Sequence, residues 1–157
     1  MLQIHIIALG SLKESYWRDA LAEYTKRLKP WATISIHELK EESFDAKSNP
    51  DVIKKKEAKK INDQLSMIND QFVIVLDEHG KQFSSRAFAQ QLNKTTMEQY
   101  NTFTFIIGGP LGLDASVIKS ANLVLSLSAA TLPHQMARVV SLFQSSNEPV
   151  IAHTKEW

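Results

Sequence analysis

Short apolar runs alternate along this chain with longer segments whose apolar residues recur at helical spacing, and this alternation restricts the possible folds most strongly. Strands separated by helices pair in parallel through right-handed crossovers, so that helices cover both faces of the sheet. We therefore predict an α/β fold with a mainly parallel sheet and helices on both faces. The strands are expected at residues 2–9, 33–39, 72–76, 103–107 and 123–127, and the helices at 14–28, 50–67, 84 or 85 onward, 114–121 and 133–144.

Length and composition set further bounds. The 157 residues fit one domain, which we expect to span residues 1–157, and a hydrophobic content of 43% is sufficient for a core. The chain has no cysteine, and its histidines are not spaced as metal ligands, so we expect neither disulfides nor a metal site. No apolar segment approaches the ~20 residues that span a membrane, and we expect a soluble, cytoplasmic protein.

The net charge of +1 gives no support to nucleic-acid binding, since autonomous RNA-binding domains usually carry a strong basic excess. The one conspicuous basic run, residues 54–60, is typical of the solvated face of a helix. Asp77 and Glu78 are adjacent on an extended segment, and their side chains should point to opposite faces. An acid–base pair is therefore not expected from these two carboxylates.

Three glycines follow the strand expected at 103–107, in the sequence Gly108-Gly109-Pro110-Leu111-Gly112. Their spacing matches neither the dinucleotide-binding fingerprint nor a P-loop. Glycines allow a ligand to approach the backbone without obstruction by a Cβ atom. The segment is either a plain tight turn or a loop that holds a cofactor through backbone groups, at the carboxyl edge of the sheet where such folds bind ligands.

A second segment of small residues follows the strand at 123–127 and leads through Pro133 into the last expected helix. His134 and Arg138 are four residues apart, so they share one face of that helix. One interpretation is a histidine in a first helical turn and a solvated arginine. The other is a pair of functional side chains beside a ligand loop.

Taken together, these segments resemble the ribosomal RNA large subunit methyltransferase H family of the knotted SPOUT superfamily. The similarity covers residues 1 to about 140. The matching stretches are Ala8-Leu9-Gly10, Tyr16-Trp17, Glu23 to Leu28, Leu76 with Gly80-Lys81, Ser84-Ser85, Phe105 to Leu113, Leu125 to Ser128, and Thr131 to Val139.

The resemblance implies a C-terminal trefoil knot, a homodimer, and transfer of a methyl group from S-adenosylmethionine to N3 of a pseudouridine in large-subunit rRNA of the assembled ribosome. His134 and Arg138 become candidate catalytic residues, because methylation of this imide nitrogen requires loss of its proton. The candidate cofactor-binding residues are Leu76, Gly108, Gly109, Gly112, Leu127, Ser128, Ala129, Ala130, Thr131 and Leu132.

After Val140 the sequence departs from the family pattern and lacks its terminal Tyr-His pair. Ser145, Ser146 and Pro149 are poor helix formers, so the last helix is expected to end near Gln144. Two alternatives to an active rRNA methyltransferase follow. One is a knotted, cofactor-binding dimer with impaired activity, and the other is a SPOUT methyltransferase with a different RNA substrate.

Overall fold

A computed structural model describes the backbone of residues 1–153 and the side chains of residues 1–142 and Ser145. Five parallel strands form one sheet in the order β2-β1-β4-β3-β5. The elements along the chain are β1 Leu2–Leu9, α1 Ser15–Leu28, β2 Ala32–Leu39, α2 Pro50–Leu65, β3 Gln71–Gln82, α3 Ser85–Met97, β4 Thr102–Ile107, α4 Ala115–Ser120, β5 Leu123–Ser126 and α5 His134–His153.

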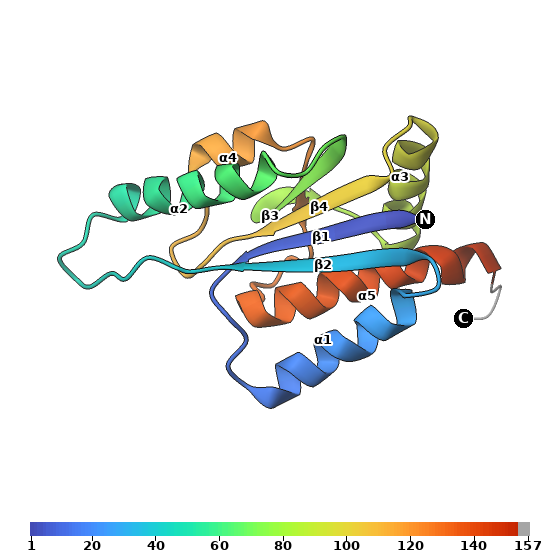
Figure 1. The fold of residues 1–157 in the computed structure, drawn as a ribbon, viewed down its shortest axis with the longest axis horizontal. Helices are drawn as coiled ribbons and strands as arrows, with labels where there is room; N and C mark the ends of the chain where they lie inside the picture. The colour runs from blue at the N-terminus through green and yellow to red at the C-terminus, as the bar shows by residue number, and fades with distance from the viewer. Residues whose placement is uncertain (154–157) are drawn as a thin grey trace.

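The helices cover both faces of the sheet, as Figure 1 shows. Helices α1, α3 and α5 pack on one face, and α2 and α4 pack on the other. Strand β1 supplies both cores, because Ile6 and Ala8 point into the first and Ile7 and Leu9 into the second. The predicted fold class is thereby confirmed, and the trefoil knot stays a prediction.

Side-chain caps fix where three of the helices begin. The Asn49 side chain accepts a hydrogen bond from the Asp51 backbone N–H at 2.9 Å, and Ser84 accepts one from Ala87 at 3.2 Å. Asp114 accepts one from the Ser116 N–H at 3.0 Å. These caps satisfy backbone donors that the first helical turn leaves unpaired. The cap at Asp114 also ends the glycine-containing loop, and so sets the length of that loop.

Strand β3 is longer than predicted. An apolar strand was expected at 72–76, whereas β3 extends from Gln71 to Gln82. It pairs with β5 in two stretches, and the register shifts between Leu76 and Lys81. Residues 77–80 form no ladder pair there, so they bulge out of the sheet at its carboxyl edge. Because these residues are mostly polar, apolar patterning could not reveal that the pairing resumes.

The predicted end of the last helix near Gln144 is wrong, because α5 continues to His153. Ser141 and Ser145 are buried, and each hydroxyl donates a hydrogen bond to the carbonyl four residues earlier, at 2.7 and 2.8 Å. Serine has a low helix propensity largely because its hydroxyl can hydrogen-bond to nearby backbone groups in non-helical conformations. Here each hydroxyl makes its hydrogen bond within the helix. Packing of α5 between α1 and α3 therefore overrides the local propensity.

Across the described part of the chain, none of the helices combines the length and the apolar character needed to cross a membrane.

Candidate active site

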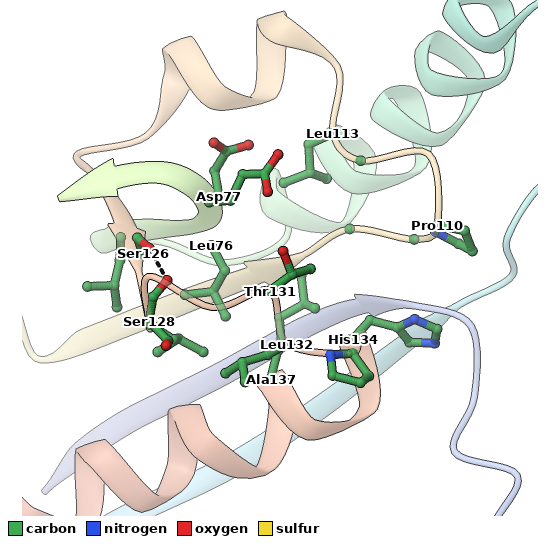
Figure 2. A pocket seen from close by; sticks show the side chains of 18 of the residues that line it. Leu76, Asp77, Pro110, Leu113, Ser126, Ser128, Thr131, Leu132, His134 and Ala137 are labelled. Atoms are coloured by element: carbon green, nitrogen blue, oxygen red, sulfur yellow. Dashed lines mark hydrogen bonds between the residues drawn. The ribbon is translucent and has the colours of Figure 1, made fainter. Parts of the chain in front are cut away.

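A cavity of about 480 Å³ opens at the carboxyl ends of β3, β4 and β5, which are neighbours in the sheet. Ligand cavities in proteins commonly measure about 300–1,000 Å³. Figure 2 shows side chains from three separate segments converging on this space. The lining comes from residues 76–78 of β3, 107–113 after β4, and 125–134 without Ala129 after β5, together with Ala137 of α5.

The structure brings nearly all of the predicted cofactor-binding residues together. Ala129 is not among the lining residues, and neither is the predicted catalytic Arg138. His134 does line the cavity, at the first turn of α5. The predicted cofactor-binding residues that line it are Leu76, Gly108, Gly109, Gly112, Leu127, Ser128, Ala130, Thr131 and Leu132.

The glycine loop is both a tight turn and a wall of the cavity. The Gly112 N–H donates a hydrogen bond to the Gly109 carbonyl at 3.0 Å, and Gly112 has a φ of +79°, which favours glycine. A Cβ atom on Gly108 would lie 2.9 Å from Cγ of Leu113, closer than side chains pack. Glycine at both positions therefore lets the loop fold back on itself and expose its backbone to the cavity.

Hydrogen bonds within the chain also hold the loop that follows β5. The buried Ser126 hydroxyl donates to the Ser128 carbonyl at 2.9 Å, and the Ala130 N–H donates to the Ser128 hydroxyl at 3.0 Å. Figure 2 marks the first of these bonds. The small side chains leave backbone groups close to the cavity, while the serines fix the course of the loop.

Asp77 and Glu78 both line the cavity, and the sequence did not indicate this. The expectation that they point to opposite faces assumed a regular strand, and the bulge in β3 removes that alternation. Asp77 accepts a hydrogen bond from the His79 backbone N–H at 2.9 Å, which holds its carboxylate in place. Two carboxylates make this side of the cavity negative, and that charge suits a cationic ligand.

His134 is half-buried and faces the cavity. Burial lowers the pKa of its imidazole below the usual 6.5, and the positive charge of Arg138 lowers it further. Glu41 and Glu14 act in the opposite direction, with smaller effect. The imidazole is therefore neutral at pH 7, and a neutral imidazole can accept a proton from a bound substrate.

Arg138 is fully buried, so its interpretation as a solvated arginine is wrong. Its guanidinium donates to the Glu38 carboxylate at 2.9 Å and to the backbone carbonyls of Leu9 and Gly10 at 3.0 and 2.8 Å. The groups that accept these hydrogen bonds, one carboxylate and two backbone carbonyls, lie at the ends of β1 and β2. Sequence could not reveal this, because the residues that hold Arg138 lie 100 to 129 positions before it along the chain.

Within the part of the chain that the structure describes, no group of three or more histidine, aspartate or glutamate side chains is placed to share a metal ion.

Comparison with known proteins identifies the family. The sequence model described as a predicted SPOUT methyltransferase matches residues 2–144. The chain belongs to the SPOUT methyltransferase family. The resemblance seen in the glycine loop and in the segment from Thr131 to Val139 is thus confirmed, and this SPOUT protein is a methyltransferase.

Three relatives carry the name ribosomal RNA large subunit methyltransferase H. The protein of Streptococcus mutans is 40% identical over 146 residues, which cover 91% of each chain. The protein of Streptococcus pneumoniae (strain CGSP14) is 42% identical over 149 residues, again 91% of each chain. The protein of Natranaerobius thermophilus is 38% identical over 159 aligned positions, which cover 99% of each chain.

The family match ends at residue 144, near the point where the sequence departs from the family pattern. The alignment with the Natranaerobius protein nevertheless spans 99% of this chain, so it includes most of the segment after Val140. These findings do not favour the alternative of a cofactor-binding dimer with impaired activity.

Proposed function

We propose that this SPOUT methyltransferase transfers a methyl group from S-adenosylmethionine to N3 of a pseudouridine in large-subunit rRNA of the assembled ribosome, in the cytoplasm. The names of the three relatives support an rRNA substrate. The observation that carries the proposal is the cavity at the ends of β3, β4 and β5, where backbone-rich loops meet the neutral imidazole of His134.

The cavity residues fit S-adenosylmethionine. The glycine loop and the loop after β5 offer backbone donors and acceptors to a polar cofactor, and apolar side chains such as Leu76 and Leu132 can pack against a flat ring. Asp77 and Glu78 provide negative charge for a ligand whose sulfonium and amino groups are cationic. The bound cofactor supplies an activated methyl group, so no metal is needed for the transfer.

The contribution of the protein is alignment, exclusion of water and removal of one proton. The two loops fix the donor in one orientation, and a methyl transfer gains most of its rate from such alignment. The N3 of pseudouridine is an imide nitrogen that must lose its proton before it attacks. We propose that His134 accepts that proton, since it faces the cavity and is neutral at pH 7.

Ribosomes that lack the modification should accept a methyl group from this enzyme without added metal. His134→Ala should lower kcat by roughly 10²–10⁴-fold, the range typical of a lost general base, while cofactor affinity changes little. Incorporation of labelled methyl groups into ribosomes, free rRNA and tRNA measures both effects. His37→Gln is the control, because His37 pairs with His5 away from the cavity lining and should keep the wild-type rate.

Preferred methylation of tRNA or free rRNA would contradict the proposed substrate and favour the alternative of a different RNA. A His134→Ala enzyme with wild-type kcat would contradict the proposed base. The two parts of the proposal can therefore fail separately.

We further propose that the protein is a homodimer. The family resemblance implied a homodimer. Of the apolar side chains on the last helix, the structure buries Val139 in the core of its own chain. Met136 and Val140 are only partly buried, and they lie on the helix that carries His134. A second copy could cover these residues beside the cavity.

Light scattering at micromolar concentration should give about twice the chain mass of 17.7 kDa, and Met136→Asp should shift the protein toward monomer. Glu23→Gln, on the exposed face of α1, is the control and should leave the mass unchanged. A wild-type mass of 17.7 kDa would contradict the proposed dimer.

A further inference from the structure

The buried guanidinium of Arg138 connects three parts of the fold. It reaches from α5 to the end of β1, where the carbonyls of Leu9 and Gly10 accept its hydrogen bonds, and to Glu38 near the end of β2. The Glu38 carboxylate also accepts a hydrogen bond from the Leu12 N–H at 3.1 Å. One ion pair therefore holds the chain after β1, the end of β2 and the beginning of α5 together.

The exposures of the two partners differ strongly. The Arg138 side chain is 1% exposed, whereas that of Glu38 is 43% exposed. A buried arginine that merely filled space would be a costly substitute for an apolar residue, because a charge must be desolvated. Here the guanidinium donates to three separate acceptors, which offset the cost of burying it and fix its position.

His134 lies one helical turn before Arg138 on the same face of α5. His134 faces the cavity, while Arg138 lies behind it against the ends of β1 and β2. Any displacement of the guanidinium would move the first turn of α5, and with it the imidazole. The loop from Thr131 to Pro133 would move as well, since it lines the cavity and leads directly into this turn.

We propose that Arg138 is a positioning residue that acts through His134: anchored by Glu38 and by the carbonyls of Leu9 and Gly10, it holds the first turn of α5, and with it the imidazole, at the cavity. This inference rests on the proposed function of His134 as the base. It also replaces the expectation that Arg138 is itself catalytic, because the guanidinium does not line the cavity.

The charged groups around His134 support this assignment. Arg138 on α5 disfavours a second positive charge on the imidazole. Glu14, which precedes α1, and Glu41, which follows β2, favour the protonated form, and Asp77 and Glu78 line the same cavity from β3. Burial and Arg138 outweigh Glu14 and Glu41, and they lower the pKa of His134. Without the guanidinium, the charges of Glu14 and Glu41 would no longer be opposed by that of Arg138.

The two halves of the ion pair should therefore change His134 in opposite directions. Arg138→Gln removes the cation and should raise the pKa of His134. Glu38→Gln removes the carboxylate that offsets the cation and should lower the pKa of His134 further. A purely structural role predicts a rise in both variants, since loosening the site would expose the imidazole and return its pKa toward the usual 6.5. The two roles therefore predict opposite shifts for Glu38→Gln alone.

Nuclear magnetic resonance titration of the histidine ring carbons in the full-length protein measures these shifts, and His134→Asn identifies the signal of His134. Glu38→Gln is the main test, because the Glu38 side chain is 43% exposed and the variant is expected to fold. A thermal melt verifies folding of each variant. Arg138→Lys serves if Arg138→Gln does not fold. It keeps the charge, so the pKa of His134 should stay low even though the hydrogen bonds change.

Methyl transfer provides the second readout. Glu38→Gln should lower kcat by about tenfold with little change in KM, because a slightly displaced base affects the chemical step more than binding. The acidic limb of its pH profile should move to lower pH, and that of Arg138→Gln to higher pH. Glu23→Gln is the matched control: it makes the same substitution in the exposed ion pair with Arg27 and should change neither readout.

A His134 pKa that rises in Glu38→Gln, or that stays unchanged in Arg138→Gln, would overturn the positioning role. Wild-type methyl transfer by His134→Asn would instead overturn the proposed base. In that case the titration of His134 would still show whether Arg138 controls the charge of this imidazole. Failure of the positioning role and failure of the proposed base can therefore be told apart.

Discussion

Replacing Gly108 by valine is expected to abolish measurable binding of S-adenosylmethionine. A Cβ atom at this position would lie 2.9 Å from Cγ of Leu113, 3.2 Å from its Cδ2 and 3.3 Å from the Gly112 carbonyl carbon. Leu113 packs in the core on the side of α2 and α4, so moving it away from the added Cβ would cost core contacts. The two limbs of the glycine loop would have to separate, and the wall of the cavity would change shape.

Isothermal titration calorimetry should show at least a hundredfold loss of affinity for Gly108→Val, about 2.7 kcal/mol or more. Gly108→Ala should already weaken binding, because the clash arises at Cβ. Gly109→Ala is the control for the folding of the loop and not for the affinity, because Gly109 also lines the cavity. A Cβ there would meet only Cβ of Leu9 at 3.7 Å and a Glu41 carboxylate oxygen at 3.9 Å, which are ordinary contacts. Equal affinity of Gly108→Val and the wild type would contradict the cofactor site.

This expectation differs in its cause from one based on sequence alone. The glycine cluster between a strand and a capped helix suggests that a side chain at Gly108 would obstruct the ligand directly. In the structure, the missing Cβ faces Leu113 and Gly112, so glycine is required by the folding of the loop on itself. The position was predictable from spacing, whereas the contact was not, because it depends on how the loop closes.

The layered fold was predictable because its signals are local. Each strand is a short apolar run, and each of the side chains that cap α2, α3 and α4 stands next to the first helical residue. The features that sequence missed depend on tertiary structure. Helix α5 packs against α1 and α3 and continues past Gln144, and the direction of Asp77 and Glu78 is set by a bulge in β3.

The candidate site shows the same division. Loops that follow β3, β4 and β5 could be assigned to one edge of the sheet, because parallel strands end together. His134 and Arg138 share a helix face by spacing, yet the structure places one at the cavity and the other behind it. That difference arises because Glu38 and the carbonyls of Leu9 and Gly10 hold the Arg138 guanidinium. The spacing of residues in the sequence does not indicate that these groups lie close to Arg138.

The pairing of β3 with β5 makes Gly80 the most sensitive glycine for stability. A Cβ atom on Gly80 would lie 2.6 Å from the carbonyl carbon of Leu125 and 2.8 Å from the backbone nitrogens of Leu125 and Ser126. These are main-chain atoms of a paired strand, so no side-chain rotation can relieve the contact. Gly80→Ala must push β5 away from β3, although Lys81 and Gln82 pair with Leu125 and Ser126 immediately beyond.

We expect Gly80→Ala to lower the free energy of unfolding by about 1–3 kcal/mol or more, the usual cost of forcing extra atoms into a packed region. Urea denaturation should show a lower midpoint at an unchanged slope, because the surface exposed on unfolding stays the same. Gly109→Ala is again the matched control. Its Cβ has room, so this variant should be as stable as the wild type or slightly more stable, since alanine restricts the unfolded chain.

The same displacement should reach the cavity. Leu125 and Ser126 line it, and the loop that follows them carries Leu127 and Ser128. Folded Gly80→Ala should therefore bind S-adenosylmethionine more weakly, although Gly80 is not among the lining residues. Comparable stability of Gly80→Ala and Gly109→Ala would show that β5 can shift without cost, and would contradict the close approach of β3 and β5 on which this side of the cavity is built.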